Sequence, residues 1–205
     1  MINFKKLFYN IIGSVYIPEE ILGSNEKILL HISDTPVIFF SALNTIIKKI
    51  KPHYIIHTGD LVDNIKLGIY PSKIDEYTTY VKKLIKILEN SPESKIYIAL
   101  GNHDSKAVIN SYVQKSILIE STQNIHIEGI PINISHYPNE IIKSPAKYNF
   151  FGHDLSLKSK INHGQIYLNG LLGIHIILLD SNKIFTLPYP YGTDDSRLCK
   201  SKIGF

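Results

Sequence analysis

The sequence has little of several residue types, and each shortage excludes a class of protein. A single cysteine, Cys199, excludes an internal disulfide and fits a reducing compartment. Arg197 is the only arginine and the lysines form no dense basic block, so the net charge of +4 indicates no nucleic-acid surface. No apolar run approaches the roughly 20 residues of a membrane helix. We therefore expect a cytoplasmic protein without a membrane span.

The composition is that of a soluble globular protein. The chain has 205 residues, 44% of them apolar and 20% charged, which is enough for one domain with a sizeable core. No repeat, low-complexity tract or linker interrupts the sequence, so we expect a single domain over residues 1–205, with a C-terminal tail at 188–205.

Residues 1–26 are expected to form an N-terminal helical extension. Lys5 and Lys6 precede the apolar residues 7–17, and this start faintly resembles a signal peptide. Asn10 interrupts the apolar segment and no small-residue cleavage site follows it. We therefore expect an amphipathic helix packed on the domain.

The first half of the chain alternates predicted strands with predicted helices. Residues 27–32, 54–57 and 95–100 are short apolar strands, and two helical stripes at 39–50 and 77–88 separate them. Ser72 with Asp75 indicates a capping box before the second helix, which Ser91 and Pro92 end. This order implies parallel strands joined by right-handed crossovers.

The second half contains short strands with short connections, which favours antiparallel or mixed pairing. The predicted strands are 117–119, 125–127, 130–135, 148–151, 165–168, 174–179 and 183–187. The expected fold class is α/β, in the mixed α+β sense: a two-sheet sandwich flanked by helices.

Polar residues follow the predicted strands at the points where the strands end. Because ligands of open α/β sheets bind beyond the carboxyl ends of the strands, these side chains should converge on one edge. They are Asp34, Asp60, Asn102 and His103 after the first three strands, and His136 and His153 after two later ones.

Carboxylates, imidazoles and one amide oxygen together suit a divalent transition metal. No cysteine accompanies them, which argues against a structural zinc site. A bridging carboxylate can hold two cations about 3.5–4 Å apart, an arrangement that activates water and stabilises phosphoryl transfer. Gly59, Gly101 and Gly152 beside these residues permit close backbone approach. Each motif alone also has a structural explanation, as a turn, a helix cap or a buried histidine, so the ordered set carries the inference.

That ordered set resembles the calcineurin-like metallophosphoesterase superfamily. The similarity runs from about residue 27 to about residue 187 and is strongest at 30–34, 57–63, 100–104, 135–138 and 151–153. The resemblance implies that Asp60 bridges two metals. It also implies that the second metal site contains Asn102, His136 and His153, with Mn, Fe or Zn as the metal.

The resemblance further implies a metal-dependent hydrolase of phosphate esters, whether phosphomonoester, phosphodiester or nucleotide, that uses a metal-activated water or hydroxide. His103 would contact the scissile phosphate and act as general acid, and Asp104 would orient its ring. The alternative is a catalytically impaired relative that binds a nucleotide or a protein partner. A nuclease has less support, because basic and aromatic surface signals are weak.

Two departures from the family pattern affect the same metal. The family's first motif is usually Asp-x-His, but Pro36 follows Asp34 and Thr35 here. The fifth is usually Gly-His-x-His, but Leu155 stands at its second histidine. Both missing histidines would serve the first metal, so we expect one tight site and a doubtful second one. Asp34 would hold a weaker metal or orient the nucleophile.

Three kinds of residue are candidates to replace the lost ligands of the first metal. Asp154 is one, and His31 is a poor one, since it faces away from Asp34 along an extended strand. The tail offers Asp194 and Asp195, while Arg197 could hold a phosphate if the tail folds over the edge of the sheet. The tail is otherwise expected to be a surface turn.

The remaining histidines are expected to be structural or exposed. His31 and His57 each precede an aspartate by three residues and should be buried and hydrogen-bonded at the sheet. The others are His53, His126, His163 and His175.

Overall fold

The computed structural model describes residues 4–198, so Cys199 and the end of the predicted tail lie outside the described residues. Its first sheet has the strand order β11-β10-β1-β2-β3-β4. Strands β1 to β4 pair in parallel, and β10 and β11 continue the sheet antiparallel beyond β1. The bounds are β1 (Ile28–Ile32), β2 (Tyr54–His57), β3 (Lys95–Ala99), β4 (Ile117–Ile119), β10 (Ile174–Leu178) and β11 (Lys183–Leu187).

The second sheet has the order β5-β6-β7-β9-β8 and is mixed, as the short connections predicted. Strands β6, β7 and β9 are parallel, while β5 and β8 pair antiparallel at the two edges. The bounds are β5 (Gln123–Ile127), β6 (Ile130–Ile134), β7 (Tyr148–Phe151), β8 (Lys160–Asn162) and β9 (Gln165–Asn169). Strand β8 was not predicted, because its three residues are exposed and carry no apolar alternation.

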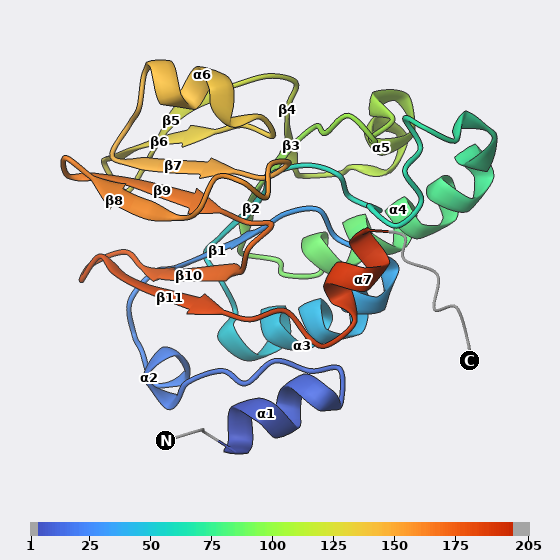
Figure 1. Ribbon diagram of the computed structural model, residues 1–205. Helices are drawn as coiled ribbons and strands as arrows, with labels where there is room; N and C mark the ends of the chain where they lie inside the picture. The colour runs from blue at the N-terminus through green and yellow to red at the C-terminus, as the bar shows by residue number, and fades with distance from the viewer. Residues whose placement is uncertain (1–3, 199–205) are drawn as a thin grey trace.

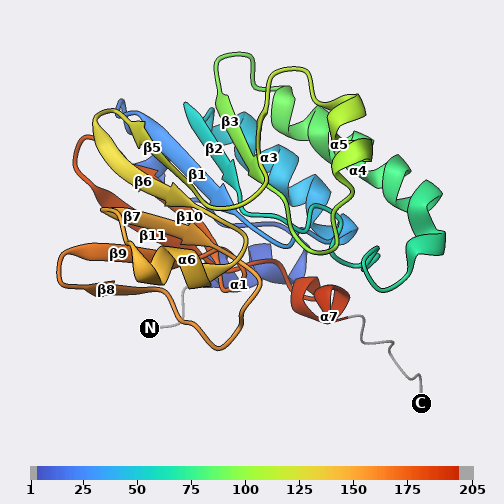
Figure 2. The same ribbon diagram turned by 90° about the horizontal axis from the view of Figure 1, so that it is seen from above.

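The two sheets pack face to face, as Figures 1 and 2 show. Successive side chains of a strand point to opposite faces. Leu29 and Ile56 therefore point between the sheets and join a core with Phe150 of the second sheet. Leu30 and Ile55 point the other way, into the core beneath the helices. The predicted sandwich flanked by helices is confirmed.

Helices α3 (Phe40–Ile50) and α4 (Ile74–Glu89) cover the outer face of the first sheet. The 3-10 turns Val37–Phe39 and Pro71–Lys73 precede them. The predicted capping box is wrong: α4 starts directly from the second turn, with Lys73 at its N-cap and no side-chain capping bond. No described helix is long and apolar enough to cross a membrane.

The other helices are short. Helices α1 (Phe4–Ile11) and α2 (Glu19–Leu22) lie in the predicted N-terminal extension, and Asn10 of α1 donates to the Tyr189 carbonyl at 2.8 Å. Helices α5 (Lys106–Tyr112) and α6 (Pro138–Lys143) follow β3 and β6. Helix α7 (Thr193–Arg197) lies in the tail beside the carboxyl ends of the strands (Figures 1 and 2).

Candidate metal and phosphate site

The loops at the carboxyl ends of five strands meet at one cavity of about 400 Å³. Loops after β1, β2 and β3 come from the first sheet, the loops after β7 and β9 come from the second, and the segment of α7 completes the lining. The lining residues are Asp34, Asp60, Asp63, Lys66, Asn102, His103, His153, Leu155, Leu171, Asp194, Arg197 and Leu198. His136, after β6, is buried directly beneath this lining, against Asp60 and Asn102. The structure therefore brings together the six side chains that the sequence placed at strand ends.

The ring of His136 shows that this cluster fits a cation. Its Nδ1 lies 2.7 Å from the carbonyl oxygen of Thr58, which only accepts, so Nδ1 carries the proton. In the neutral ring Nε2 then offers a lone pair, 3.1 Å from the amide oxygen of Asn102 and 3.6 Å from a carboxylate oxygen of Asp60. Nε2 of His136 and the oxygens of Asn102 and Asp60 thus converge on one point, an arrangement that a divalent cation satisfies.

His153 completes this set from the second sheet. One ligand atom from each of Asp60, His136 and His153 lies within 4.8 Å of the other two. His153 and Asn102 are exposed, while Asp60 and His136 are buried, so the site opens to solvent on one side. Burial and the positive charge that His136 can carry lower the pKa of His153, which favours the neutral, ligating form of the ring.

The backbone at these residues is strained. Asp34, Asp60 and His153 have φ values of 48°, 55° and 65°, in the left-handed region that favours glycine. Each such residue costs on the order of 1–3 kcal/mol and persists only where the surrounding structure enforces it. Three of the five candidate metal ligands therefore have backbone conformations that their residue types disfavour, and the tertiary structure holds them there.

Glycines at the strand ends make this packing possible. A Cβ at Gly101 would lie 2.1 Å from the Asp60 carboxylate, and one at Gly59 would lie 2.5 Å from Nδ1 of His136. A Cβ at Gly152 would lie 2.5 Å from the Asp34 carboxylate. The glycines therefore allow the candidate ligand side chains to approach the backbone of neighbouring loops closely.

Burial makes the carboxylate of Asp60 the most perturbed acid of the site. Its exposed fraction is 2%, and burial together with the charges of Asp104, Asp34 and Asp63 raises its pKa well above the usual value. A nearby divalent cation would favour the charged form and offset this. The acid is therefore suited to a site that holds a cation.

His103 lies on the same edge, but Asp104 does not orient it as the family resemblance implied. The Asp104 carboxylate accepts from the backbone N–H groups of Asp60, Leu61 and Gly101, and from the Tyr77 hydroxyl, at 2.8–2.9 Å. Its oxygens are thus occupied in joining the loops after β2 and β3. Nδ1 of His103 has no hydrogen-bond partner, the only such buried side-chain atom in residues 8–198.

Sequence reasoning missed Asp63 and Lys66, which both line the cavity. Asp63 is 1% exposed and forms an ion pair with Lys66. Burial and the charge of Asp34 raise the pKa of Asp63 to about 6, although Lys66 lowers it. Asp63 also lies close to Asp60 and His103, with ligand atoms within 4.8 Å of one another. Its position three residues after Asp60 was the available signal.

The two histidines of the family's first-metal motifs have no counterpart beside Asp34. The Asp34 carboxylate accepts from the Ser33 hydroxyl at 2.5 Å and from the His153 N–H at 3.3 Å. Pro36 has no ligating group and Leu155 lines the cavity with an apolar side chain. Asp154 does not replace them, because its carboxylate accepts from Ser156 and lies outside the cavity lining.

The tail folds over the edge of the sheet, and Arg197 is buried there with 3% exposure. Its guanidinium donates to the carbonyls of Ser33, Asp34 and Leu171 and to the carboxylate of Asp194, at 2.6–3.0 Å. At most one of its five N–H groups remains free, so Arg197 does not offer a bidentate fork to a phosphate. The prediction of a surface turn is wrong for this part of the tail.

Neither tail aspartate is placed as a replacement ligand. Asp194 lines the cavity but pairs with Arg197, and Asp195 lies outside the lining. Among the described residues, neither joins a group of acids and histidines close enough to hold a metal.

The buried histidines behave as expected. His31 contacts the ring of His175 at 3.1 Å and the Thr58 hydroxyl at 3.0 Å, and His57 bonds to the Thr35 hydroxyl. Burial lowers the pKa of His57 to about 3 and keeps it neutral. His53, His126 and His163 are exposed.

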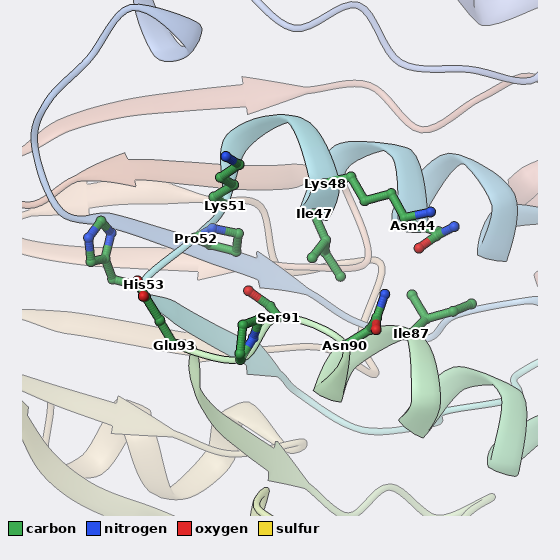
Figure 3. Close-up of a pocket in the computed structure, with 11 residues that line it drawn as sticks. Asn44, Ile47, Lys48, Lys51, Pro52, His53, Ile87, Asn90, Ser91 and Glu93 are labelled. Carbon is green, nitrogen blue, oxygen red and sulfur yellow. The ribbon is translucent and has the colours of Figure 1, made fainter.

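A second cavity of about 410 Å³ lies at the opposite, amino-terminal ends of β2 and β3 (Figure 3). It is lined by the end of α3 and the loop after α4, including Lys48, Lys51, His53 and Glu93. Within residues 4–198, the groups that could hold a metal are both at the other edge. The second cavity is thus separate from the site of strand-end ligands.

The fold and the site together define a two-sheet α/β protein with a metal-type donor cluster at shared strand ends. A model of the calcineurin-like phosphoesterase family matches residues 28–202, so the chain belongs to that family. At the level of the superfamily, this membership supports a divalent-metal-dependent phosphoester hydrolase.

Solved structures of similar fold include an archaeal phosphodiesterase, at 14% identity and a TM-score of 0.54, over 77% of this chain and 97% of that one. The phosphoesterase Yfce from E. coli is 12% identical with a TM-score of 0.52, over 79% and 98% of the two chains. At these identities the similarity shows the fold alone. No curated protein matches the sequence.

Proposed function

We propose that the protein hydrolyses phosphate esters at the cavity of strand-end ligands, with one tightly bound divalent cation. Asp60, Asn102, His136 and His153 would hold it, and their donor atoms suit manganese, iron or zinc. The observation that supports this most directly is the convergence of Nε2 of His136 with an oxygen of Asn102 and one of Asp60, while Nδ1 bonds to the Thr58 carbonyl. When bound, such a cation supplies Lewis-acid polarisation of a phosphoryl oxygen and a more acidic water.

His103 is the proposed proton donor to the leaving group. It lines the cavity beside Asn102, and its backbone N–H donates to the Asp60 carboxylate at 2.9 Å, which fixes the loop against the metal ligands. In the substrate-free protein, burial and the charge of Lys66 lower the pKa of His103 to about 4. The negative charge of a bound phosphate would raise that pKa, so the ring gains its proton when substrate binds.

The substrate is proposed to be a phosphate ester or nucleotide whose ester group is partly apolar. Leu155, Leu171 and Leu198 contribute to the cavity from three separate segments. A cavity of about 400 Å³ has the size of common small-molecule sites, which combine apolar walls with a few polar anchors. Phosphomonoesters, phosphodiesters and nucleotides all meet this description.

The second candidate is a catalytically impaired member that binds a nucleotide or a protein partner. The observation that favours it is the altered first metal site, where Pro36 and Leu155 replace two imidazoles. Loss of one cation removes part of the positive charge that stabilises the transition state. Binding would then survive while turnover fell.

Turnover of 4-nitrophenyl phosphate and bis(4-nitrophenyl) phosphate, measured with increasing Mn²⁺, separates these candidates. We expect metal-dependent turnover by the wild type and by His163→Ala, a control at an exposed histidine of the β8–β9 turn. His153→Ala should lose it. Tight nucleotide binding without turnover would favour the binding protein. Salt-sensitive binding to single strands would favour a nuclease.

A further inference from the structure

Lys66 is a cationic side chain of the strand-end cavity that keeps donors free for a ligand. An ammonium group has three N–H donors. Within the described residues, the Lys66 ammonium forms one hydrogen bond, to the carboxylate of Asp63, and its side chain keeps 21% exposure. Arg197 is the other lysine or arginine that the described residues contribute to the lining, and at most one of its N–H groups is free. Lys66 is therefore the lining cation that can offer two donors to a ligand.

The pair of Lys66 and Asp63 lies beside the proposed reaction centre. Ligand atoms of Asp63, Asp60 and His103 lie within 4.8 Å of one another. Because the Lys66 ammonium is bonded to Asp63, it is adjacent both to the proposed proton donor and to a central metal ligand. Burial first, and then the Lys66 charge, lower the pKa of His103, which agrees with this placement. A group bound between Asp60 and His103 would thus meet the ammonium.

The backbone holds Lys66 in place. Its φ of 52° lies in the left-handed region, and its carbonyl accepts from the N–H groups of Ile69 and Tyr70 at 2.8 and 2.9 Å. Such a conformation persists only where the surrounding structure enforces it. The side chain is fixed at its other end by Asp63, which is 1% exposed. The charge is therefore preorganised, which reduces the entropy that binding of an anion costs.

An ammonium in this position suits a phosphoryl group with two negative charges. A phosphomonoester carries close to two negative charges near neutral pH, whereas a phosphodiester carries one, so the same ammonium attracts the monoester more strongly. The carboxylates of Asp34, Asp60 and Asp63 line the same cavity. Without Lys66, their negative charges would oppose binding of a dianion more than binding of a monoanion.

We propose that Lys66 is the substrate-binding residue that anchors the phosphoryl group and shifts the selectivity of the site toward phosphomonoesters. Its two free N–H groups would donate to phosphoryl oxygens while the third stays on Asp63, in charge-assisted hydrogen bonds. The proposal rests on the proposed function for the place where the phosphoryl group binds. It predicts that removal of the ammonium weakens binding in proportion to the negative charge of the ligand.

The test compares wild type, Lys66→Met and Lys66→Arg as full-length proteins in Mn²⁺. Calorimetric titration with inorganic phosphate should show about 10- to 100-fold weaker binding by Lys66→Met, the usual loss for a hydrogen bond between charged groups. KM for 4-nitrophenyl phosphate should rise by a similar factor, and KM for bis(4-nitrophenyl) phosphate should rise less. Lys66→Arg keeps the charge and should recover part of the affinity. The matched control is Lys106→Met, at an exposed lysine paired with Glu120, which should behave as the wild type.

A double variant separates binding of the phosphoryl group from neutralisation of Asp63. Lys66→Met alone leaves a buried acid without its partner and can lose stability, whereas Lys66→Met combined with Asp63→Asn removes both charges. If Lys66 binds the phosphoryl group, phosphate affinity stays weak in the double variant. Wild-type affinity in the double variant, or in Lys66→Met, overturns the proposal, because Lys66 would then only balance Asp63. Failure of both variants to fold also overturns it, because the ion pair would then serve the fold.

Metal titration tests the other use of these side chains. Asp60, Asp63 and His103 form a group that could hold a second cation. Calorimetric titration of the wild type with Mn²⁺ would then give a second equivalent that Asp63→Asn removes. That result would reject the role of Lys66, because a cation would take its place at Asp63. A Mn²⁺ stoichiometry that Asp63→Asn leaves unchanged supports the proposal.

Failure of the proposed function is read from turnover. If the wild type binds phosphate, Lys66→Met binds it weakly and neither hydrolyses an ester, the hydrolase fails while Lys66 stands as an anion-binding residue. If both proteins show metal-dependent turnover with the same KM for the monoester, the hydrolase stands and the role of Lys66 is rejected. A wild type that neither binds phosphate nor turns over an ester rejects both.

Discussion

At the scale of single residues, His103 has a polar atom that the fold leaves unsatisfied. Its Nδ1 is buried without a partner, although its backbone N–H is bonded to Asp60. An unpaired buried nitrogen costs on the order of 1–3 kcal/mol. This cost falls on a side chain that lines the cavity, which supports a catalytic role for the His103 ring.

We expect His103→Ala to reduce turnover of a poor alkyl leaving group by about 10²–10⁴-fold, the usual contribution of a general acid. Turnover of a nitrophenyl ester should fall less, because that leaving group needs no proton. Metal content, measured by elemental analysis, should stay at the wild-type value, since the ring is not assigned to the cation. Loss of metal from His103→Ala would instead identify the ring as a ligand.

At the scale of elements, the loop of residues 61–70 packs directly on the loop that carries Asn102 and His103. Gly68 makes the contact possible, because a Cβ there would lie 2.4 Å from the carbonyl oxygen of Asn102 and 3.0 Å from Nδ1 of His103. The backbone of Gly68 therefore sets where the His103 ring can lie. The loop after β2 thus positions the loop after β3.

We expect Gly68→Ala to push these loops apart and lower kcat by about 10- to 100-fold, because small misplacements of reacting groups are costly. Stability should fall by roughly 1–3 kcal/mol, as for other overpacked sites. Metal content should change less than kcat. The control is Gly23→Ala, where the added Cβ meets only the Glu19 carbonyl, at 3.4 Å. Equal kcat in Gly68→Ala and the wild type would show that the loops yield without moving His103.

At the scale of the whole molecule, the donor cluster joins the two sheets. Asp60 and Asn102 follow strands of the first sheet, whereas His136 and His153 follow strands of the second. A cation bound by all four would cross-link the sandwich at one edge. Metal binding and folding should therefore be linked, because the unfolded chain offers no preformed site.

We expect a chelator to lower the melting temperature of the wild type. At a free Mn²⁺ concentration of about 100 times Kd, binding to the native state adds about 2.7 kcal/mol. For a chain of this size that corresponds to about 5–10 °C. Differential scanning calorimetry of His153→Ala should show a much smaller effect of Mn²⁺, while His163→Ala should match the wild type. A metal effect that survives in His153→Ala would place the cation elsewhere.

The sequence by itself determined the strand ends and most of the donor set. Short apolar runs located β1, β2, β3 and β7 to within one residue, because burial of a strand is a local pattern. A residue directly after a parallel strand must lie at the carboxyl edge, so Asp34, Asp60 and Asn102 could be placed together before any contact was known. Gly59 and Gly101, next to Asp60 and Asn102, also indicated that loops approach one another closely at this edge.

Only the tertiary structure decided what anchors the tail and what holds the loops of the site together. Arg197 reaches Asp34 across 163 residues of sequence, and Asp104 bonds to the backbone of Asp60 and not to the ring beside it. Helix α7, which carries Arg197, has five residues and no apolar period of its own. Such contacts depend on which segments the folded chain places side by side, and residue spacing encodes only local geometry. The anchoring of the tail at the cavity is therefore a property of the folded chain, which the motifs alone could not specify.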